Sequence, residues 1–276
     1  MTPTITDKHR EQYHHDGYFI LKGIVPENQR QALIQAVKDL MEASIENGRP
    51  ELRWISKEDR IPGRIGGILE PTRIRPGFAN SLADGPYFSV AEQILNSPVR
   101  YCVCGMLAGG GGEAYIQNWH RDTSPTEGDQ ELAVLQRNYR LYTQINAPLY
   151  PDRYLQIVPG SHLRKSTEDE LDVLHNNPKG DMPGQLTVET EPGDIVFYYN
   201  NMHHRGYNPK GELRWTMHHG FMVADAPVYD VEEGQESWMG QEGYIDSLPA
   251  GLKVYMQRYL DSCRDGPAPK IREIQE

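Results

Sequence analysis

Residues 192 to 222 read PGDIVFYYNNMHHRGYNPKGELRWTMHHGFM, and the stretch carries two runs of strand-forming side chains between turn residues. The first run, at 194–199, follows the Pro-Gly-Asp turn at 192–194, and the second, at 213–223, follows the turn at 208–211. Side chains alternate between the two faces of a strand, so Arg214, Thr216 and His218 share one face. The stretch predicts a strand, a turn and a returning strand with polar side chains on one side.

Short strand-like segments of the same kind recur along the chain. They are expected near 100–107, 114–122, 138–147, 154–158, 186–190, 194–199 and 213–223. Turn residues separate them, in keeping with the 26 glycines and 20 prolines of the chain. Many short strands without regular intervening helices indicate a sandwich, a jelly roll or a barrel.

Helical patterns flank these strands. They predict a short helix near the N-terminus, one that begins at Pro26 and ends near Gly48, one around 88–97 and a last one at 252–263. No internal repeat or linker divides the chain. The whole of residues 1–276 is therefore expected to be one domain, with helical N-terminal elements over about 1–97, a β core over about 100–223 and a C-terminal helix over about 251–264.

Composition narrows the possible partners and the compartment. The net charge is −11, which argues against nucleic acid and anionic membranes as partners, because both bind basic surfaces. No apolar run has the length of about 20 residues that a membrane span needs, and the N-terminus lacks the apolar core of a signal peptide. The three cysteines are Cys102, Cys104 and Cys263, an odd and sparse set that favours reduced thiols in the cytoplasm.

The stretch YIQNWHRDT, residues 115–123, places His120 and Asp122 two positions apart in a predicted strand. Both side chains then lie on the same face, where they can bind one ion. A histidine from His203 or His204 would complete a set of two imidazoles and one carboxylate, which binds Fe(II) and leaves positions open for substrate and oxygen. Arg214 could hold a carboxylate through two parallel hydrogen bonds.

Taken in order, His120-x-Asp122, QIVPGSH, PGDIVFYYNNMHHRGYN and Arg214 resemble the phytanoyl-CoA dioxygenase family of Fe(II)/2-oxoglutarate oxygenases. The N-terminal HHDGYFILKGIV, followed by an amphipathic helix, also matches that family. The resemblance implies a mainly β fold with flanking helices, a double-stranded β-helix or cupin-like jelly roll with the metal at its open mouth. It further implies Fe(II), 2-oxoglutarate and O2 as cofactors, with ascorbate as the reductant in vitro.

The resemblance also assigns residues to roles. His120 and Asp122 match the family's iron ligands, and Arg214, with Thr216 beside it, matches the arginine that pairs with the distal carboxylate of 2-oxoglutarate. Tyr142 and Gln144, in YTQINAPL, lie on the strand from which relatives direct side chains at the cosubstrate.

The distal histidine has two candidates. The HRG pattern of some relatives selects His204, whereas counting back five positions from Asn208, as in other relatives, selects His203. Alternation along a strand prevents both from facing the iron. We expect His204 to be the ligand, with His203 as the alternative.

The resemblance implies hydroxylation of an unactivated C–H bond of a small molecule, or a related oxidation such as desaturation, because halogenating relatives lack the carboxylate ligand and Asp122 is present. The alternative is a non-redox metal-binding jelly-roll protein, such as a cupin-like isomerase or a sensor. Such a protein would keep the histidines but would not need Arg214.

Residues 50–80 are expected to form an irregular loop over the mouth of the jelly roll, and they concentrate basic side chains in an acidic protein. Guanidinium groups suit phosphate, phosphonate or carboxylate groups. The segment therefore predicts a small polar substrate with an anionic group, and the proposed contacts are Arg60, Arg64, Arg73 and Arg75. Alternatively, these arginines pair with neighbouring acidic residues on the surface, where each pair adds little stability.

Overall fold

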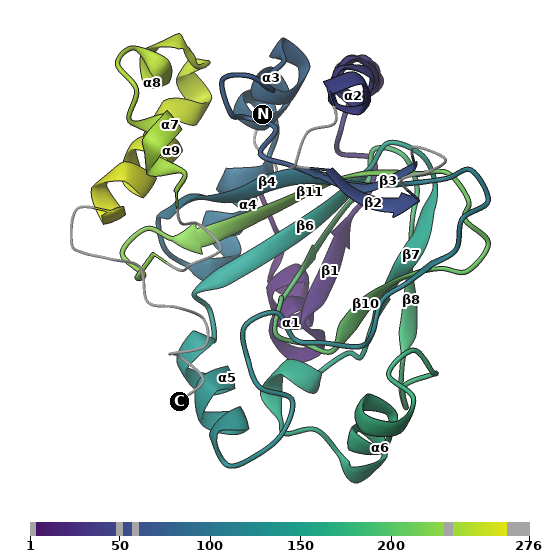
Figure 1. The fold of residues 1–276 in the computed structure, drawn as a ribbon. Coiled ribbons are helices and arrows are strands. Elements are labelled where there is room, and N and C mark those ends of the chain that lie inside the picture. Colours follow the sequence, from purple (N-terminus) through teal and green to yellow (C-terminus); the bar gives the residue numbers. More distant parts are fainter. Residues whose placement is uncertain (1–3, 48–51, 57–60, 229–233, 264–276) are drawn as a thin grey trace.

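The structure is a computed structural model that describes residues 4–47, 52–56, 61–228 and 234–263 (Figure 1). Its strands are short, as the turn-rich sequence predicts. They are β1 (Tyr18–Leu21), β2 (Leu52–Ser56), β3 (Ile61–Gly66), β4 (Val99–Gly109), β5 (Tyr115–Ile116), β6 (Tyr142–Pro148), β7 (Asp152–Ile157), β8 (Leu186–Thr190), β9 (Ile195–Tyr198), β10 (His204–Asn208) and β11 (Arg214–Val223).

These strands form two antiparallel sheets. The larger sheet has the order β1-β9-β6-β11-β4-β3-β2, and the smaller sheet has the order β5-β10-β7-β8. Strands that are distant in sequence are neighbours, as β1 and β9 are, which is the crossing connectivity of a jelly roll. The predicted fold class, mainly β with flanking helices, is confirmed.

Helices flank the two sheets. They are α1 (Asp7–Asp16), α2 (Glu27–Asn47), α3 (Pro76–Asp84), α4 (Tyr87–Leu95), α5 (Gln130–Asn138), α6 (Glu168–Asn176), α7 (Glu236–Met239), α8 (Tyr244–Ser247) and α9 (Ala250–Ser262), with a 3-10 turn at η1 (Ser161–Leu163). Figure 1 shows α2, α3 and α7 to α9 on one side of the larger sheet, and α5 and α6 at the opposite end of the molecule. Among the described residues, no helix has the length and apolarity to cross a membrane.

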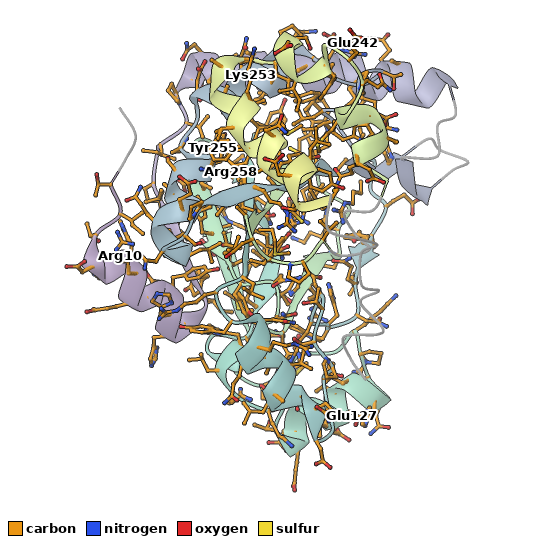
Figure 2. All side chains as sticks on the ribbon, turned by 90° about the vertical axis from the view of Figure 1, so that its left-hand side faces the viewer. Arg10, Glu127, Glu242, Lys253, Tyr255 and Arg258 are labelled. Atoms are coloured by element: carbon orange, nitrogen blue, oxygen red, sulfur yellow. The ribbon has the colours of Figure 1, made fainter. Side chains whose placement is uncertain are left out.

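The main core lies between the larger sheet and the helices above it. The ring of Phe88 in α4 stacks on Tyr255 of α9 with centroids 3.8 Å apart and meets Phe221 of β11 edge-on at 4.8 Å. Figure 2 shows Tyr255 and Arg258 of α9 in this helical layer, and Arg258 donates to Glu92 of α4 at 2.7 Å. Full burial of one such aromatic side chain contributes about 1.5–3 kcal/mol to folding. The helical layer thus fixes one face of β11 and leaves the other face for the site.

Strand β11 shows how alternation divides these two faces. Met217 and Phe221 point to the helical core, whereas Arg214, Thr216 and His218 point to the space between the sheets. The shared face that the sequence predicted for these three polar residues is therefore present. A second, smaller apolar cluster lies between the sheets, and its buried members are Leu155, Ile157, Val188, Val196, Tyr198 and Met202.

The structure corrects two expectations about local elements. Residues 50–80 are not one irregular loop: β2 and β3 form a hairpin that extends the larger sheet, and α3 follows. The stretch 192–222 forms three strands rather than two, because the chain leaves the larger sheet after β9 and joins the smaller one as β10. Helices α5 and α6 were also missed. Pairing with β4 explains the first correction, since the Gly- and Pro-containing sequence of β3 has a weak intrinsic strand preference.

Two buried histidines predict how stability changes with pH. Burial lowers the pKa of His162 to about 4 and that of His219 to about 3, from an ordinary 6.5. Below pH 6.5 these histidines bind protons in the unfolded chain but stay neutral in the folded chain. Their contribution to stability is therefore complete above pH 6.5 and is lost as the pH falls towards 4. We expect each histidine to add about 1.4 kcal/mol per pH unit to the slope of the unfolding free energy.

Urea unfolding of wild type and His162→Gln at pH 6.0 and 5.0 measures this slope. The substitution should reduce the slope by about 1.4 kcal/mol per pH unit. The control is His175→Gln, which makes the same substitution at a half-exposed histidine outside the core. An equal slope in wild type and His162→Gln would contradict the prediction.

Candidate active site

Three metal-competent side chains meet where the end of one loop crosses the start of β10. His120 and His204 form an isolated antiparallel bridge, with backbone N–H groups donating to each other's carbonyl at 3.2 and 3.1 Å. Asp122 lies two residues beyond His120, and its Oδ1 is 3.5 Å from Nε2 of His120 and 3.6 Å from Nε2 of His204. One ligand atom from each of the three residues lies within 4.8 Å of the others.

Each imidazole is fixed by a bond to a nearby carbonyl. Nδ1 of His120 donates to the carbonyl of Asn118 at 2.8 Å, and Nδ1 of His204 donates to the carbonyl of Met202 at 3.0 Å. Such bonds hold the tautomer in which Nε2 carries a free lone pair, and they orient the ring for a metal. Burial, and then the neighbouring His120, lower the pKa of His204 to about 4, so His204 is neutral at pH 7, the form that binds metal.

His203 points to the opposite side of the strand. Its Nε2 lies 2.9 Å from Oγ of Ser166, its backbone N–H donates to Oγ of Ser161 at 2.9 Å, and the residue is fully buried. Of the two candidates for the distal position, the structure brings His204 to His120 and Asp122, and it places His203 in a polar cluster behind them.

The two histidines are therefore expected to respond differently to substitution. His204→Ala should lower the affinity for Fe(II) by about two orders of magnitude, because one of three ligands is lost. His203→Ala should keep iron affinity within about threefold but cost about 1–3 kcal/mol of stability, since buried polar partners are left unpaired. Equilibrium dialysis against Fe(II) and urea unfolding measure the two effects. The assignment is wrong if the iron loss follows His203→Ala instead.

Arg121, between His120 and Asp122, holds this segment in place through buried contacts. Its guanidinium donates to the carbonyls of Ser161 at 2.9 Å and Asn201 at 2.6 Å, and to Oε1 of Glu131 in α5 at 3.1 Å. The side chains of Arg121 and Glu131 are buried. A buried ion pair with several added hydrogen bonds fixes geometry, and removing one partner costs about 3–5 kcal/mol. Neither residue stood out in the sequence, because their contact depends on where α5 packs.

A cavity of about 250 Å³ opens between the sheets beside the three ligands. Both sheets contribute to its wall, which combines a few apolar side chains with many amides and three arginines. The lining residues are Arg64, Val103, Leu107, Gln117, His120, Asp122, Thr123, Asn138, Leu141, Tyr142, Gln144, Asn146, Leu155, Tyr198, Asn200, Asn201, His204, Arg205, Gly206, Arg214, His218 and Met222.

Arg214 lines this cavity with an open hydrogen-bonding position. Its Nε donates to Oδ2 of Asp152 at 3.0 Å, and the hydroxyl of Thr216 donates to the same oxygen. The guanidinium is buried, and within the described part of the chain its Nη2 has no hydrogen-bond partner. Asp152 was not identified from the sequence, where an aspartate after a proline resembles an ordinary turn residue.

Tyr142 and Gln144 also line the cavity, on β6. The Tyr142 hydroxyl donates to Oε1 of Gln144 at 3.4 Å, and burial raises the pKa of Tyr142. Gly220 of β11 lies opposite Gln144, and a Cβ there would come within 1.9 Å of the Tyr142 hydroxyl. A glycine is therefore required for the tyrosine to occupy this position.

Of the four arginines proposed as substrate contacts, one lines the cavity, two do not, and one lies outside the described residues. Arg64 of β3 lines the cavity. Arg73 forms an ion pair with Glu70 and donates to the carbonyl of Gly66 at 3.3 Å, and Arg75 precedes α3 and donates to the carbonyl of Ile74 at 3.0 Å. Neither of these two lines the cavity, and Arg60 lies outside the described residues.

Comparison with solved structures places this arrangement among proteins of the same architecture. EctD from S. alaskensis, solved with 2-oxoglutarate and 5-hydroxyectoine, is 17% identical, with 90% of this chain and 86% of that chain covered and a TM-score of 0.64. SnoK, a non-heme α-ketoglutarate-dependent carbocyclase from nogalamycin biosynthesis, is 18% identical over 90% of this chain and 92% of that one, with a TM-score of 0.61. The epimerase SnoN from the same biosynthesis is 18% identical over 83% and 88%, with a TM-score of 0.58.

The chain has the jelly-roll fold of these three proteins. No protein-family model matches the sequence, and no curated protein matches it. At this level of identity the similarity establishes the fold, so the chemistry must be argued from the residues of the site.

Proposed function

We propose that this protein is an Fe(II)- and 2-oxoglutarate-dependent oxygenase that hydroxylates a C–H bond of a small molecule. The observation that carries the proposal is the presence of two features in one cavity. His120, Asp122 and His204 converge there, and Arg214 lines the same cavity with a buried guanidinium whose Nη2 has no hydrogen-bond partner among the described residues. The motif spacing further supports membership of the phytanoyl-CoA dioxygenase family.

The three ligands fit a first-row metal ion. Two ligand atoms about 2.1 Å from one ion at right angles lie about 3.0 Å apart. Oδ1 of Asp122 is 3.5 and 3.6 Å from the two imidazole nitrogens, so a closure of about half an ångström satisfies an ion. Two imidazoles and one carboxylate are the donor set of non-heme iron oxygenases and leave positions open for a bidentate cosubstrate and O2.

The side chain of Arg214 fits a cosubstrate with two carboxylate groups. Asp152 holds Nε of Arg214 and so fixes the plane of the guanidinium, which leaves the Nη2 edge to donate to a carboxylate. Thr216 donates to the same Asp152 oxygen and completes this support. A cosubstrate held at its distal end by Arg214 is then oriented with its other end towards His120, Asp122 and His204.

The remaining wall excludes water and orients the substrate. When bound, iron with O2 and 2-oxoglutarate supplies the oxidising power that breaks an unactivated C–H bond, while 2-oxoglutarate loses carbon dioxide and becomes succinate. The protein contributes position: Tyr142, Gln144 and Tyr198 bound the space beside the ligands. Hydroxylation is the outcome we propose, because all three protein ligands are present and leave no position for a halide.

Isothermal titration of anaerobic, Fe(II)-loaded protein with 2-oxoglutarate tests this function without knowledge of the substrate. We expect binding that depends on iron, and succinate formation when O2 and ascorbate are supplied with candidate substrates. Iron binding without any binding of 2-oxoglutarate would reject the proposal and support a non-redox isomerase or sensor instead.

A further inference from the structure

Arg64 enters the cavity because of its register in the larger sheet. Strand β3 pairs with β4 so that Arg64 lies opposite Leu107 and Ile65 lies opposite Met106. Ile65 and Met106 are fully buried in the helical core. Alternation therefore directs Arg64 and Leu107 to the other face, where both line the cavity.

The charge of Arg64 has no counterion among the residues that the structure describes. Within the described residues, no hydrogen bond or ion pair involves its guanidinium, whereas Arg73 of the same segment pairs with Glu70. Arg64 is half-buried, and a cation that is partly removed from water without a partner carries a desolvation cost. An anion that enters the cavity would offset this cost.

Arg64 shares the cavity wall with His218, Tyr142 and Tyr198, and its charge acts on their pKa values. After burial, the positive charge of Arg64 is the next cause that lowers the pKa of His218. It also opposes the rise in pKa that burial causes at Tyr142 and Tyr198, and the charge of Asp122 acts on these same two tyrosines. Arg64 and the residues His120, Asp122 and His204 therefore line the same cavity.

Amide groups line the rest of this space. Buried amide atoms of Asn138, Asn146 and Asn200 have no hydrogen-bond partner within the described chain. All three residues line the cavity, at the end of α5, in β6 and after β9. Unpartnered buried amides are costly and are typically satisfied by a ligand or water, so this wall suits a molecule with polar groups.

The cosubstrate leaves Arg64 free. 2-Oxoglutarate has two carboxylate groups, and the proposed function places one at the metal ligands and the other at Arg214. Arg64 is a third place in this cavity where an anion could bind, and 2-oxoglutarate has no third carboxylate to fill it. Guanidinium groups bind carboxylate and phosphonate groups in a bidentate manner, which gives both affinity and orientation.

We infer that the substrate is a small polar molecule with a carboxylate or phosphonate group, which Arg64 binds while the C–H bond to be oxidised faces His120, Asp122 and His204. This inference rests on the proposed function for the direction of the substrate. The anion site itself depends only on Arg64 and the amide wall.

A set of matched compounds tests the inference. Propane, cyclopentane and cyclohexane skeletons are each supplied as the carboxylate, the phosphonate and the carboxamide, and are titrated calorimetrically into anaerobic protein loaded with Fe(II) and 2-oxoglutarate. In wild type, at least one oxyanion should bind ten times more tightly than its carboxamide. Arg64→Met should reduce this ratio to about two or less, and Arg64→Lys should retain part of it. The control Arg75→Met changes an arginine of the same segment outside the cavity and should keep the full ratio.

Two results would overturn the inference. One is that every carboxamide binds wild type as tightly as its matched oxyanions, and the other is that the oxyanion preference survives Arg64→Met. A tenfold loss of 2-oxoglutarate affinity in Arg64→Met, with the preference retained, would assign Arg64 to the cosubstrate instead. Repeating the titrations on metal-free protein separates the two proposals. If Fe(II)-loaded protein does not bind 2-oxoglutarate, the oxygenase function is rejected, and an oxyanion preference that metal-free protein shows and Arg64→Met loses would still support the anion site.

Discussion

Asp122→Ala is expected to abolish 2-oxoglutarate turnover and to weaken Fe(II) binding by about two orders of magnitude or more. Asp122 is the only carboxylate among the three converging ligands, and its Oδ1 lies almost equally far from the two imidazole nitrogens. Two neutral imidazoles alone bind a divalent ion weakly and leave its charge without a counterion. Iron content after gel filtration and succinate formation with O2 measure the two effects.

The matched control for this substitution is Asp225→Ala. Asp225 is an exposed carboxylate two residues after the end of β11, so the change removes one negative charge without touching the cavity. Iron content and turnover should equal those of wild type. Asp122→Glu adds a second comparison, because it keeps the charge but lengthens the side chain, and it should bind iron with reduced turnover. Full turnover in Asp122→Ala would contradict the ligand assignment.

The convergence of His120 and Asp122 could be predicted from the sequence, because side chains two positions apart in a strand share a face. The strand predicted over 114–122 is wrong in extent, since the structure has only β5 and an isolated bridge at His120, yet the two side chains still lie together. The same rule separates His203 from His204, and the structure places these neighbours on opposite sides of β10. The shared face of Arg214, Thr216 and His218 followed from the same periodicity.

The support for these residues could not be predicted, because it depends on which distant strands become neighbours. Asp152 meets Arg214 across 62 positions of sequence, and Arg121 meets α5 only after the loop beside it has folded back. Arg64 is a comparable case. Its basic segment was visible in the sequence, but the register of β3 on β4 decides that Arg64, rather than Arg73 or Arg75, enters the cavity.

Charge explains why a cavity in so acidic a protein can bind anions. The chain has a net charge of −11, which repels anionic metabolites at long range. Inside the cavity the balance is reversed, since Arg64, Arg205 and Arg214 line it together with one carboxylate of the described residues, Asp122, which our proposal commits to the metal. Asp152 is paired with Arg214 and does not line the cavity. Recognition of an anion must therefore come from short-range, bidentate contacts, which depend on the planar shape of the guanidinium.

Arg214→Lys is expected to raise the 2-oxoglutarate concentration needed for half-maximal turnover by about ten- to a hundredfold, while Fe(II) still binds. We expect the guanidinium to perform two tasks: Nε donates to Asp152, and Nη2, which has no hydrogen-bond partner among the described residues, would donate to a carboxylate. A lysine ammonium is a single point charge that Asp152 would capture, which leaves no directed donor for the cosubstrate.

The control for this prediction is Arg153→Lys, one position after Asp152 on β7. Arg153 is half-exposed and pairs with Glu191 at 2.7 Å, so its replacement keeps the charge and leaves the cavity unchanged. Titration of 2-oxoglutarate into anaerobic Fe(II)-loaded protein separates the variants, since only Arg214→Lys should lose cosubstrate affinity. Asp152→Asn is informative beside them, because it keeps an acceptor for Nε but removes a negative charge near the cosubstrate. An unchanged 2-oxoglutarate affinity in Arg214→Lys would mean that another cation holds the distal carboxylate, and Arg64 would be the first to test.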